Sequence, residues 1–227
     1  MGRSSLEKKT TERAWVCGWE FELAARADGA QWIAGVDEVG RGPLFGPVVA
    51  AAVILPEGCR LRGLTDSKML SERERERFDE RIRAKAVAWA IAEVDVATID
   101  RINILQASRL AMRLAVSRLA REPDCLLIDG NQRIECGCSQ RTIVQGDARS
   151  LSIAAASVIA KVYRDQMMRE MDGRFPGYGL ARNKGYGSVE HRAALKRLGV
   201  TELHRRSFEP VAQVCGQSGF EFTLMGD

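Results

Sequence analysis

The segment Ile33-Ala34-Gly35-Val36-Asp37-Glu38-Val39-Gly40 is a short apolar run that ends in two acids and a glycine. An apolar run of this length, bounded by turn residues, is typical of a buried strand. Neighbouring strand residues point to opposite faces, so Asp37 and Glu38 can approach one site only if the strand ends or twists there. A carboxylate beside a buried strand is costly unless it is paired or bound to metal, so we expect Asp37 to have a partner.

Strands and helices alternate along the rest of the chain. Apolar, β-branched runs predict buried strands at 32–36, 47–55, 87–94, 125–129 and 142–144. Helices are predicted at 71–85, from a capping box at Ser71 and Glu74, and at 104–120, 150–171 and 189–198. Residues 1–30 are expected to form an extension with at most one helix, and the chain after the last helix to form a tail. This alternation indicates an α/β layered fold.

The composition excludes several classes of protein. The chain has 227 residues, of which 45% are apolar and 28% charged, and no apolar run approaches the roughly 18 residues of a membrane span. The charged N-terminus does not resemble a secretion signal, and six scattered cysteines do not form a disulfide scaffold. We therefore expect a cytoplasmic protein with no membrane partner. A net charge of +4 permits an anionic partner without proving one.

Two further acids follow predicted strands. Asp129 ends the run 125–129, and Asp147 comes shortly after 142–144. Acids at the carboxyl ends of neighbouring strands can converge at one edge of an α/β sheet. Oxygen-rich clusters select hard cations such as Mg²⁺ or Mn²⁺. The alternative is that these acids only form turns, because Asp-Gly and Gly-Asp are good turn sequences.

The predicted helix 150–171 carries a stripe of hydrogen-bond donors. Ser157, Lys161 and Arg164 are spaced to share one helix face and could bind consecutive phosphates. Ser150 and Ser152 lie at the helix start, where free N–H groups also favour anions. The alternative is an ordinary solvated face.

Several loop residues have two interpretations. Gly40-Arg41-Gly42 suits close approach of a phosphodiester or a tight turn, and Thr65–Lys68 is either a donor loop or a helix entry. Tyr186 could stack on a sugar or base, although an aromatic ring in a glycine-rich loop more often covers the core. The two histidines, His191 and His204, are expected to be structural or surface donors.

A set of short motifs occurs in one order and spacing over about residues 31 to 211. They are G-V-D-E-V-G-R-G-P at 35–43, D-S-K at 66–68, I-D-G at 128–130, G-D at 146–147, I-A-A-A-S at 153–157, A-K-V at 160–162, R-D at 164–165, K-G-Y at 184–186 and H-R-R-S-F at 204–208. Together they closely resemble the bacterial type 2 ribonuclease H family, ribonuclease HII. Each motif is weak alone, but the combination is highly specific.

The resemblance implies a ribonuclease H-like fold with a mixed central sheet flanked by helices. It implies a domain at 31–222 after the extension at 1–30, with a catalytic core at about 31–175 and a C-terminal helical region at about 176–222. By matching motif, the catalytic and metal-binding carboxylates fall on Asp37, Glu38, Asp129 and Asp147. Asp165 is also an acid in a matching motif, but it is not a ligand in the family pattern.

The resemblance also implies a set of substrate contacts. The motif that reads the junction between a ribonucleotide and DNA falls on Gly40, Arg41 and Gly42, and the junction-sensing tyrosine falls on Tyr186. The phosphate contacts fall on Ser67, Lys68, Ser157, Lys161 and Arg164. The resemblance thus favours the ligand-binding interpretation of several residues for which local sequence left both open.

The activity implied is cleavage of the RNA strand of RNA–DNA hybrids, and cleavage 5′ to ribonucleotides embedded in duplex DNA for their removal. The expected mechanism is hydrolysis with two Mn²⁺ or Mg²⁺ ions about 4 Å apart, which leaves a 5′ phosphate and a 3′ hydroxyl. Competing hypotheses are another ribonuclease H-like polynucleotide enzyme, such as an integrase-type transferase or a junction resolvase, and a non-catalytic nucleic-acid-binding protein.

Two features depart from the family pattern. Gln145 stands where many relatives have a lysine, which removes one positive charge beside the predicted metal site. The extension at 1–30 is longer than the family minimum, and Val214–Asp227 shows no clear sliding-clamp motif. The resemblance favours a monomer.

Overall fold

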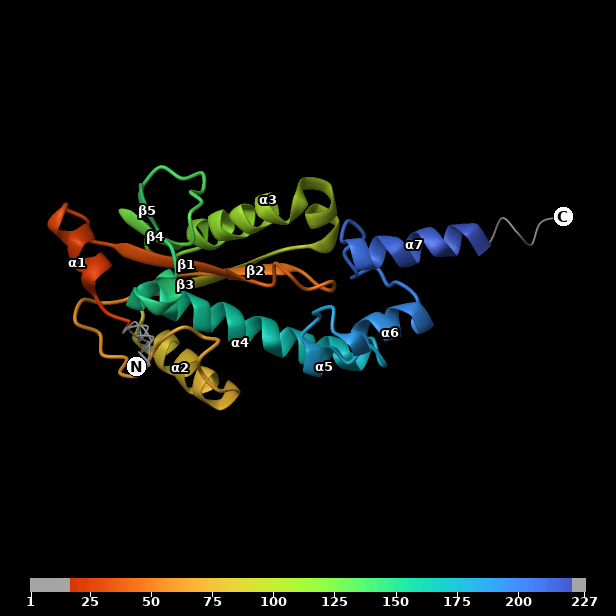
Figure 1. Ribbon diagram of the computed structural model, residues 1–227. Coiled ribbons are helices and arrows are strands. Elements are labelled where there is room, and N and C mark those ends of the chain that lie inside the picture. Colours follow the sequence, from red (N-terminus) through yellow and green to blue (C-terminus); the bar gives the residue numbers. More distant parts are fainter. Residues whose placement is uncertain (1–16, 222–227) are drawn as a thin grey trace, which may run out of the picture.

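A mixed five-stranded sheet forms the centre of the molecule in the computed structural model, which describes residues 17–221, with side chains described as far as residue 216. The strand order is β3-β2-β1-β4-β5 (Figure 1). β1 pairs antiparallel with β2 and parallel with β4, so it lies at the centre of the sheet. The strands are β1 (Ile33–Val39), β2 (Val48–Ile54), β3 (Ala88–Val94), β4 (Cys125–Asp129) and β5 (Ser139–Ile143).

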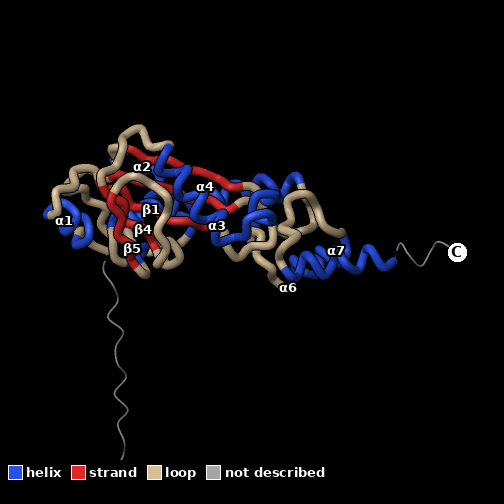
Figure 2. The backbone as a smooth tube through the Cα atoms, turned by 90° about the horizontal axis from the view of Figure 1, so that it is seen from above, coloured by secondary structure: helices blue, strands red, loops and turns tan. Residues whose placement is uncertain are grey.

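Helices cover both faces of this sheet. α3 packs on one face, whereas α2 and α4 cover the other (Figure 1). α1 lies at one end of the sheet, and the three C-terminal helices extend from the opposite end (Figures 1 and 2). The helices are α1 (Glu20–Ala27), α2 (Glu72–Lys85), α3 (Val96–Ser117), α4 (Leu151–Arg174), α5 (Leu180–Asn183), α6 (Val189–Leu198) and α7 (Glu209–Glu221), with a 3₁₀ turn, η1, at Gly146–Ala148. The predicted α/β fold is confirmed. No helix among the described residues has the length and apolarity to cross a membrane.

A glycine in β1 brings the central strand against α4. A Cβ atom on Gly35 would lie 2.0 Å from the carbonyl carbon of Ser152, in the first turn of α4. No side chain larger than hydrogen fits there, so strand and helix backbones touch. This contact fixes the N-terminal end of α4 relative to the strand that carries Asp37 and Glu38.

β1 is longer than the sequence predicts. The strand continues through Asp37 and Glu38 to Val39 because each of these residues is paired with β2. The expectation that the strand ends before the two acids is therefore wrong. A sequence window shows the loss of apolar residues at Asp37 but not the antiparallel partner that keeps the backbone extended.

Two other predicted elements are misplaced. β5 occupies 139–143 rather than 142–144, and its first four residues are polar because it is the edge strand. α3 begins at Val96, eight residues before the predicted start at 104. The helix is broken at Asn103, whose φ is +66°, and the Asn103 Oδ1 atom accepts the Gln106 N–H at 3.1 Å. The apolar periodicity therefore identified only the part of α3 that follows the break.

The C-terminal part of the described chain contains more helix than the sequence predicts. The predicted tail contains α7, and α5 occupies part of a predicted glycine-rich loop.

The Ser71 capping box is confirmed, with Ser71 Oγ accepting the Glu74 N–H and the Glu74 carboxylate accepting the Ser71 N–H. The domain boundaries at 30, 175 and 222 stay predictions, and residues 1–16 and 222–227 lie outside the described residues.

Candidate active site

Four acids from three elements form the acid cluster, defined as Asp37, Glu38, Asp129 and Asp147. Val36 of β1 pairs with Ile128 of the parallel strand β4, so Asp37 and Asp129 follow at equivalent positions on the same face. Asp147 lies on η1, which is held to the end of β4 because Asp129 Oδ1 accepts the Gly146 N–H at 2.7 Å. The elements that carry Asp37, Asp129 and Asp147 are thus brought to one edge of the sheet.

Glu38 reaches the cluster from the other side of β1. Ala34 and Val36 belong to the core layer under α3, and strand alternation directs Glu38 toward that same layer. Asp37 points to the α4 side, where its carboxylate interacts with the Ser157 hydroxyl. The two adjacent acids therefore lie on opposite faces near the end of the strand.

The acids oppose one another electrostatically. Burial raises the pKa of Asp37 well above its usual range, and the negative charges of Glu38 and Asp129 raise it further. Burial also raises the pKa of Glu38, against the opposing effect of Arg41. The pKa of Asp147 is raised by burial and by the charge of Asp129. This clustering of like charges makes the ionised state of the site costly.

Two exposed cations border the acid cluster. Arg41 Nη1 lies 3.2 Å from Glu38 Oε1, and Lys68 Nζ lies 3.4 Å from Asp147 Oδ2. The side chains of Arg41 and Lys68 are 51% and 77% exposed, so water screens both pairs. The second oxygen of Glu38, Oε2, is buried without a hydrogen-bond partner. The site has more buried negative charge than its own residues neutralise.

The donor set fits a hard divalent cation by its chemistry. Carboxylate oxygens are the ligands that Mg²⁺ and Mn²⁺ prefer, and the Glu38 Oε2 atom, which has no hydrogen-bond partner, is free to bind a metal ion. Among the described residues, no three His, Cys, Asp or Glu side chains are close enough together to hold an ion as they stand. Asp37 Oδ1 accepts the Glu38 N–H at 2.8 Å, and Asp129 Oδ1 faces the amides of η1. Side-chain rotation would be required to gather the acids.

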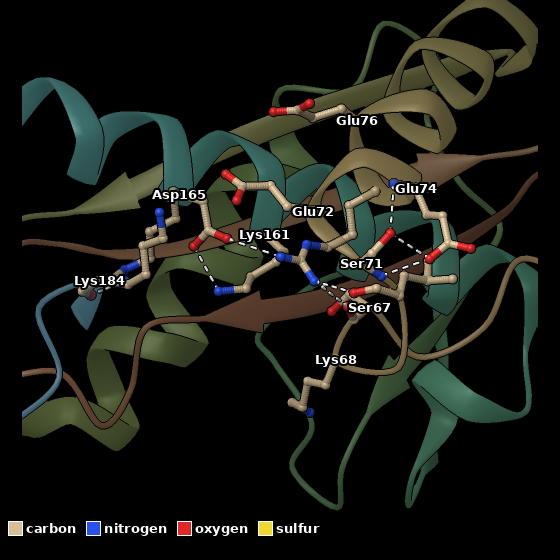
Figure 3. Close-up of polar contacts among 12 residues, drawn as sticks. Ser67, Lys68, Ser71, Glu72, Glu74, Glu76, Lys161, Asp165 and Lys184 are labelled. Carbon is tan, nitrogen blue, oxygen red and sulfur yellow. Dashed lines mark hydrogen bonds and ion pairs between the residues drawn. The ribbon is translucent and has the colours of Figure 1, made fainter. Parts of the chain in front are cut away.

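The predicted phosphate donors lie in two places. Ser67 Oγ and Ser157 Oγ are hydrogen bonded at 3.0 Å, and both side chains are buried next to Asp37. Lys161 Nζ instead pairs with Asp165 Oδ1 at 2.7 Å (Figure 3). Figure 3 shows Lys68 extending away from that pair. The loop 65–68 leads into α2, whose N-cap is Ser71, as the helix-entry interpretation expects, and its role as a donor loop stays a prediction.

Asp165 lies apart from the acid cluster. Its carboxylate pairs with Lys161 and, at 3.6 Å, with Arg75 of α2. Asp165 is 3% exposed, so these two cations satisfy a buried charge. The arrangement agrees with the family pattern, in which this acid is not a ligand.

Arg164 does not form part of an exposed donor stripe. Its side chain is 0% exposed and donates to the carbonyls of Phe45, Pro47 and Lys184. The expectation of a polar helix face open to phosphates is therefore wrong at this residue. Helical spacing placed it correctly beside Ser157 and Lys161, but the segment 45–47 and the loop after α5 cover it.

The start of α4 is closed to external anions. Glu22 of α1 is 1% exposed, and its Oε1 atom accepts the Ser150 hydroxyl at 2.7 Å and the Ser152 N–H at 2.9 Å. A carboxylate of the protein itself thus occupies the position where the sequence suggested a phosphate. The interpretation of Ser150 and Ser152 as anion donors is wrong, because residues 128 to 130 positions apart meet there.

The glycine loop, defined as Gly40–Gly42, lies directly after β1 and next to Tyr186. Gly40 has a φ of +92°, and a Cβ atom there would lie 2.3 Å from Arg164 Nε. A Cβ atom on Gly42 would lie 3.4 Å from the Tyr186 ring. Tyr186 is 45% exposed, so the interpretation that its ring covers the core is wrong. Glycines at these positions allow the loop to approach both side chains.

The structure identifies one residue near the loop to which the sequence analysis gave no role. Arg205 is 0% exposed and donates to three carbonyls of the segment 40–46. The only sequence signal was its place in the motif His204–Phe208.

The two histidines are both buried, with their Nε2 atoms 3.2 Å apart, so the structural interpretation of them is confirmed.

Comparison with known proteins gives one consistent result. A family model described as Ribonuclease HII matches residues 34–211. A protein named Ribonuclease HII from Koribacter versatilis is 54% identical over 209 residues, which cover 92% of this chain and 82% of that protein. Another of that name, from Solibacter usitatus, is 55% identical over 195 residues, which cover 86% of this chain and 85% of that protein.

Solved structures resemble the fold. Ribonuclease H2 from Pyrococcus horikoshii OT3 superposes with a TM-score of 0.71 at 24% identity, covering 82% of this chain and 98% of that one. Bst-RNase HIII in complex with Mn²⁺ superposes with a TM-score of 0.65 at 21% identity, covering 86% of this chain and 73% of that one. At these identities the likeness supports the fold alone.

Proposed function

The chain belongs to the ribonuclease HII family of metal-dependent endonucleases that act on the RNA of RNA–DNA hybrids, and from this premise we propose that it also cuts 5′ to single ribonucleotides in duplex DNA. The observation that carries the proposal is the acid cluster beside the glycine loop. Glu38 ends the acid-bearing part of β1, and Gly40 begins the loop two residues later. A cleavage site and a site that can contact ribose are thus adjacent in the chain and in space.

The four acids are proposed to hold the divalent cations. Asp37, Asp129 and Asp147 supply oxygens on the α4 side of the sheet, and Glu38 supplies the buried Oε2 atom that has no hydrogen-bond partner. Two such ions, when bound, supply an activated water and stabilise the leaving 3′ oxygen. Mn²⁺ is a candidate because it is bound by Bst-RNase HIII, and Mg²⁺ has the same preference for oxygen ligands.

The residues around the acids are proposed to orient the nucleic-acid backbone. Lys68 can exchange its Asp147 partner for a phosphate, because its side chain is 77% exposed and water already competes for the ion pair. Ser157 is hydrogen bonded to Asp37 and to Ser67, so it can fix that carboxylate and is itself oriented by Ser67. Arg41 neutralises Glu38 and extends into solvent, where a phosphodiester can compete for it.

Ribose recognition is proposed to come from the glycine loop and Tyr186. The 2′-hydroxyl is the group that distinguishes RNA from DNA at a single position. Backbone groups of Gly40–Gly42 can approach a ribose closely because Cβ atoms are absent at Gly40 and Gly42. The exposed Tyr186 ring lies against Gly42 and can stack on the neighbouring sugar or base.

The test is cleavage of three end-labelled duplexes: DNA with one ribonucleotide, an RNA–DNA hybrid, and DNA alone. We expect a cut 5′ to the single ribonucleotide with Mn²⁺ or Mg²⁺, none with chelator, and no cut in DNA. Asp129→Asn should remove cleavage while the duplex is still bound, because the amide keeps the volume but loses the charged ligand.

The other outcomes discriminate the competing hypotheses. Cleavage of DNA alone would favour a transferase or resolvase that ignores the 2′-hydroxyl. Cleavage of the hybrid alone would retain the acid cluster and remove the proposed ribose-junction role of Arg41 and Tyr186. Binding without cleavage under any metal condition would support a non-catalytic protein.

A further inference from the structure

Two arginines are buried behind the glycine loop. Arg164 of α4 and Arg205, which follows α6, are both 0% exposed. Fully buried arginines are rare because removing the guanidinium from water is costly. Their position next to a proposed substrate-reading loop requires an explanation.

Arg205 binds the loop through three separate carbonyls. Its Nη2 atom donates to Gly40 O at 2.6 Å, its Nη1 atom to Arg41 O at 2.9 Å, and its Nε atom to Gly46 O at 2.9 Å. The planar guanidinium thus fixes both ends of the segment 40–46. The backbone adds a further restraint, because the Arg205 N–H donates to Leu44 O at 2.8 Å.

Arg164 joins the same segment to the loop that carries Tyr186. Its Nη2 atom donates to Phe45 O at 3.1 Å, and its Nη1 atom donates to Lys184 O at 2.9 Å. The Leu44 N–H also donates to Gly185 O at 2.8 Å. The glycine loop and Tyr186 are therefore held at one separation by groups that lie behind them.

Peptide carbonyls, rather than direct ion pairs with acids, are the hydrogen-bond partners of these guanidinium groups. Among the described residues, neither Arg164 nor Arg205 forms an ion pair within 4 Å. Burial lowers the pKa of Arg164 to about 10 and of Arg205 to about 9, so both remain charged at neutral pH. Two positive charges directly behind the loop also favour a phosphodiester in front of it.

We propose that Arg205, together with Arg164, is a positioning residue that sets the glycine loop against Tyr186 and so determines the preference for a ribonucleotide–DNA junction. The inference rests on the proposed function and deepens it. Arg205 touches no substrate in this role. It acts through the carbonyls of Gly40 and Arg41, which orient the adjacent amides toward a ribose.

Lysine cannot replace this arginine. An ammonium group is a single point donor on a flexible stem, whereas the guanidinium presents fixed donors to three carbonyls at once. Arg205→Lys therefore keeps the charge and most of the volume but leaves some of the three carbonyls unpaired. The matched control is Arg206→Lys, because Arg206 is the exposed neighbour in the same motif.

The experiment compares these two variants on the single-ribonucleotide duplex and on the RNA–DNA hybrid, with Mn²⁺. For Arg205→Lys we expect kcat on the single-ribonucleotide duplex to fall about 10- to 100-fold, since small misplacements of positioning groups cost this much. We expect the loss on the hybrid to be several-fold smaller, because a run of ribonucleotides offers alternative contacts. Arg206→Lys should match the wild type on both duplexes.

A second variant tests the loop side of the contact. Gly40→Ala places a methyl group against Arg164 and strains a residue with φ of +92°. If both changes disturb the same loop geometry, the double variant Gly40→Ala with Arg205→Lys should lose less than the product of the single losses. Each variant is also unfolded thermally to separate lost stability from lost positioning.

The outcomes separate the inference from the proposed function. Wild-type protein that fails to cut the single-ribonucleotide duplex contradicts the proposed function itself. If Arg205→Lys lowers the Tm but leaves the ratio of kcat/KM on the two duplexes unchanged, the positioning role is contradicted. A purely structural residue would lower kcat/KM on both duplexes by the same factor. A lowered ratio with little change in Tm supports it.

Discussion

The acid cluster and the glycine loop adjoin at Glu38 and Gly40, yet their polar groups are satisfied to opposite degrees. In the acid cluster, burial and like charges raise the pKa values of Asp37, Glu38 and Asp147, and Glu38 Oε2 has no hydrogen-bond partner. Behind the glycine loop, each nitrogen of the two buried guanidinium groups donates to a backbone carbonyl.

The difference indicates how each region works. Unbalanced negative charge favours binding of a cation, so a bound cation should stabilise the acid cluster. The guanidinium groups already hold the backbone of the glycine loop, so the loop needs little reorganisation when the substrate binds. It is therefore preorganised for binding.

Asp37→Asn should reduce cleavage about 1,000-fold, because it removes a charged oxygen from the acid cluster. The same variant should unfold at a higher temperature than the wild type without divalent cations, because an amide removes a buried charge while retaining an oxygen for the Glu38 N–H. Activity is measured as kcat on the RNA–DNA hybrid, and stability as Tm in chelator.

The control for Asp37→Asn is Glu122→Gln, which makes the equivalent change at an exposed position. It should alter neither kcat nor Tm. A Tm for Asp37→Asn that is clearly lower than that of the wild type would contradict the view that the acid cluster is electrostatically unfavourable.

Stability should depend on pH and on Mn²⁺ together. The folded state holds Asp37, Glu38 and Asp147 at raised pKa values, so it binds more protons than the unfolded chain above the ordinary carboxyl pKa. Without metal, this contribution to stability is full at acidic pH and is lost as the pH rises through the raised values. Mn²⁺ at about 100 times its Kd should add about 2.7 kcal/mol.

The measurement is Tm at pH 5 and pH 8, with Mn²⁺ or with chelator. The gain from Mn²⁺ should be larger at pH 8, where protons no longer compete for the acids. Asp129→Asn serves as the comparison variant and should reduce the gain at pH 8. Equal gains at both pH values would indicate that the ion binds elsewhere.

Tyr186→Ala should lose about 10-fold in kcat/KM on the single-ribonucleotide duplex, which corresponds to one stacking contact of roughly 1–3 kcal/mol. Asp66→Ala should lose less, because the Asp66 carboxylate is bound to its own loop through the Lys68 N–H at 2.8 Å. Equal losses in the two variants would contradict junction sensing by the tyrosine ring.

Lys68→Gln should have the smallest effect. It removes one exposed cation, so we expect a several-fold weaker Kd for the hybrid in chelator and a salt dependence reduced by about one phosphate contact. Lys196→Gln, at an exposed position on α6, is the control. An unchanged salt slope for Lys68→Gln would remove Lys68 from the proposed phosphate contacts.

The sequence could predict the acids better than their surroundings. Asp37, Asp129 and Asp147 end apolar runs or follow them closely, and such local patterns predict both the α/β fold and the carboxyl edge of the sheet. The role of Glu38 could not be obtained in this way, because its direction depends on β1 continuing to Val39 under pairing with β2.

The remaining errors arise from contacts between distant segments. Helical spacing predicts the shared face of Ser157 and Arg164, but not the segment 45–47 that buries Arg164. Turn chemistry suggests a glycine loop at 40–42, but not the guanidinium of Arg205, which is 164 or 165 residues away. The motifs that resemble the family contain these residues, but they do not reveal the contacts that each residue makes in the fold.

The bond from Glu22 to the start of α4 has a consequence for synthesis on the ribosome. Glu22 is translated well before Ser150 and Ser152, and the intervening chain of 128 to 130 residues takes about 6 to 26 s at roughly 5 to 20 residues per second. During that interval the Glu22 carboxylate lacks its hydrogen-bond partners Ser150 and Ser152. The hydrogen bonds of α1 to the start of α4 can therefore form only after the segment carrying Asp147 has been synthesised.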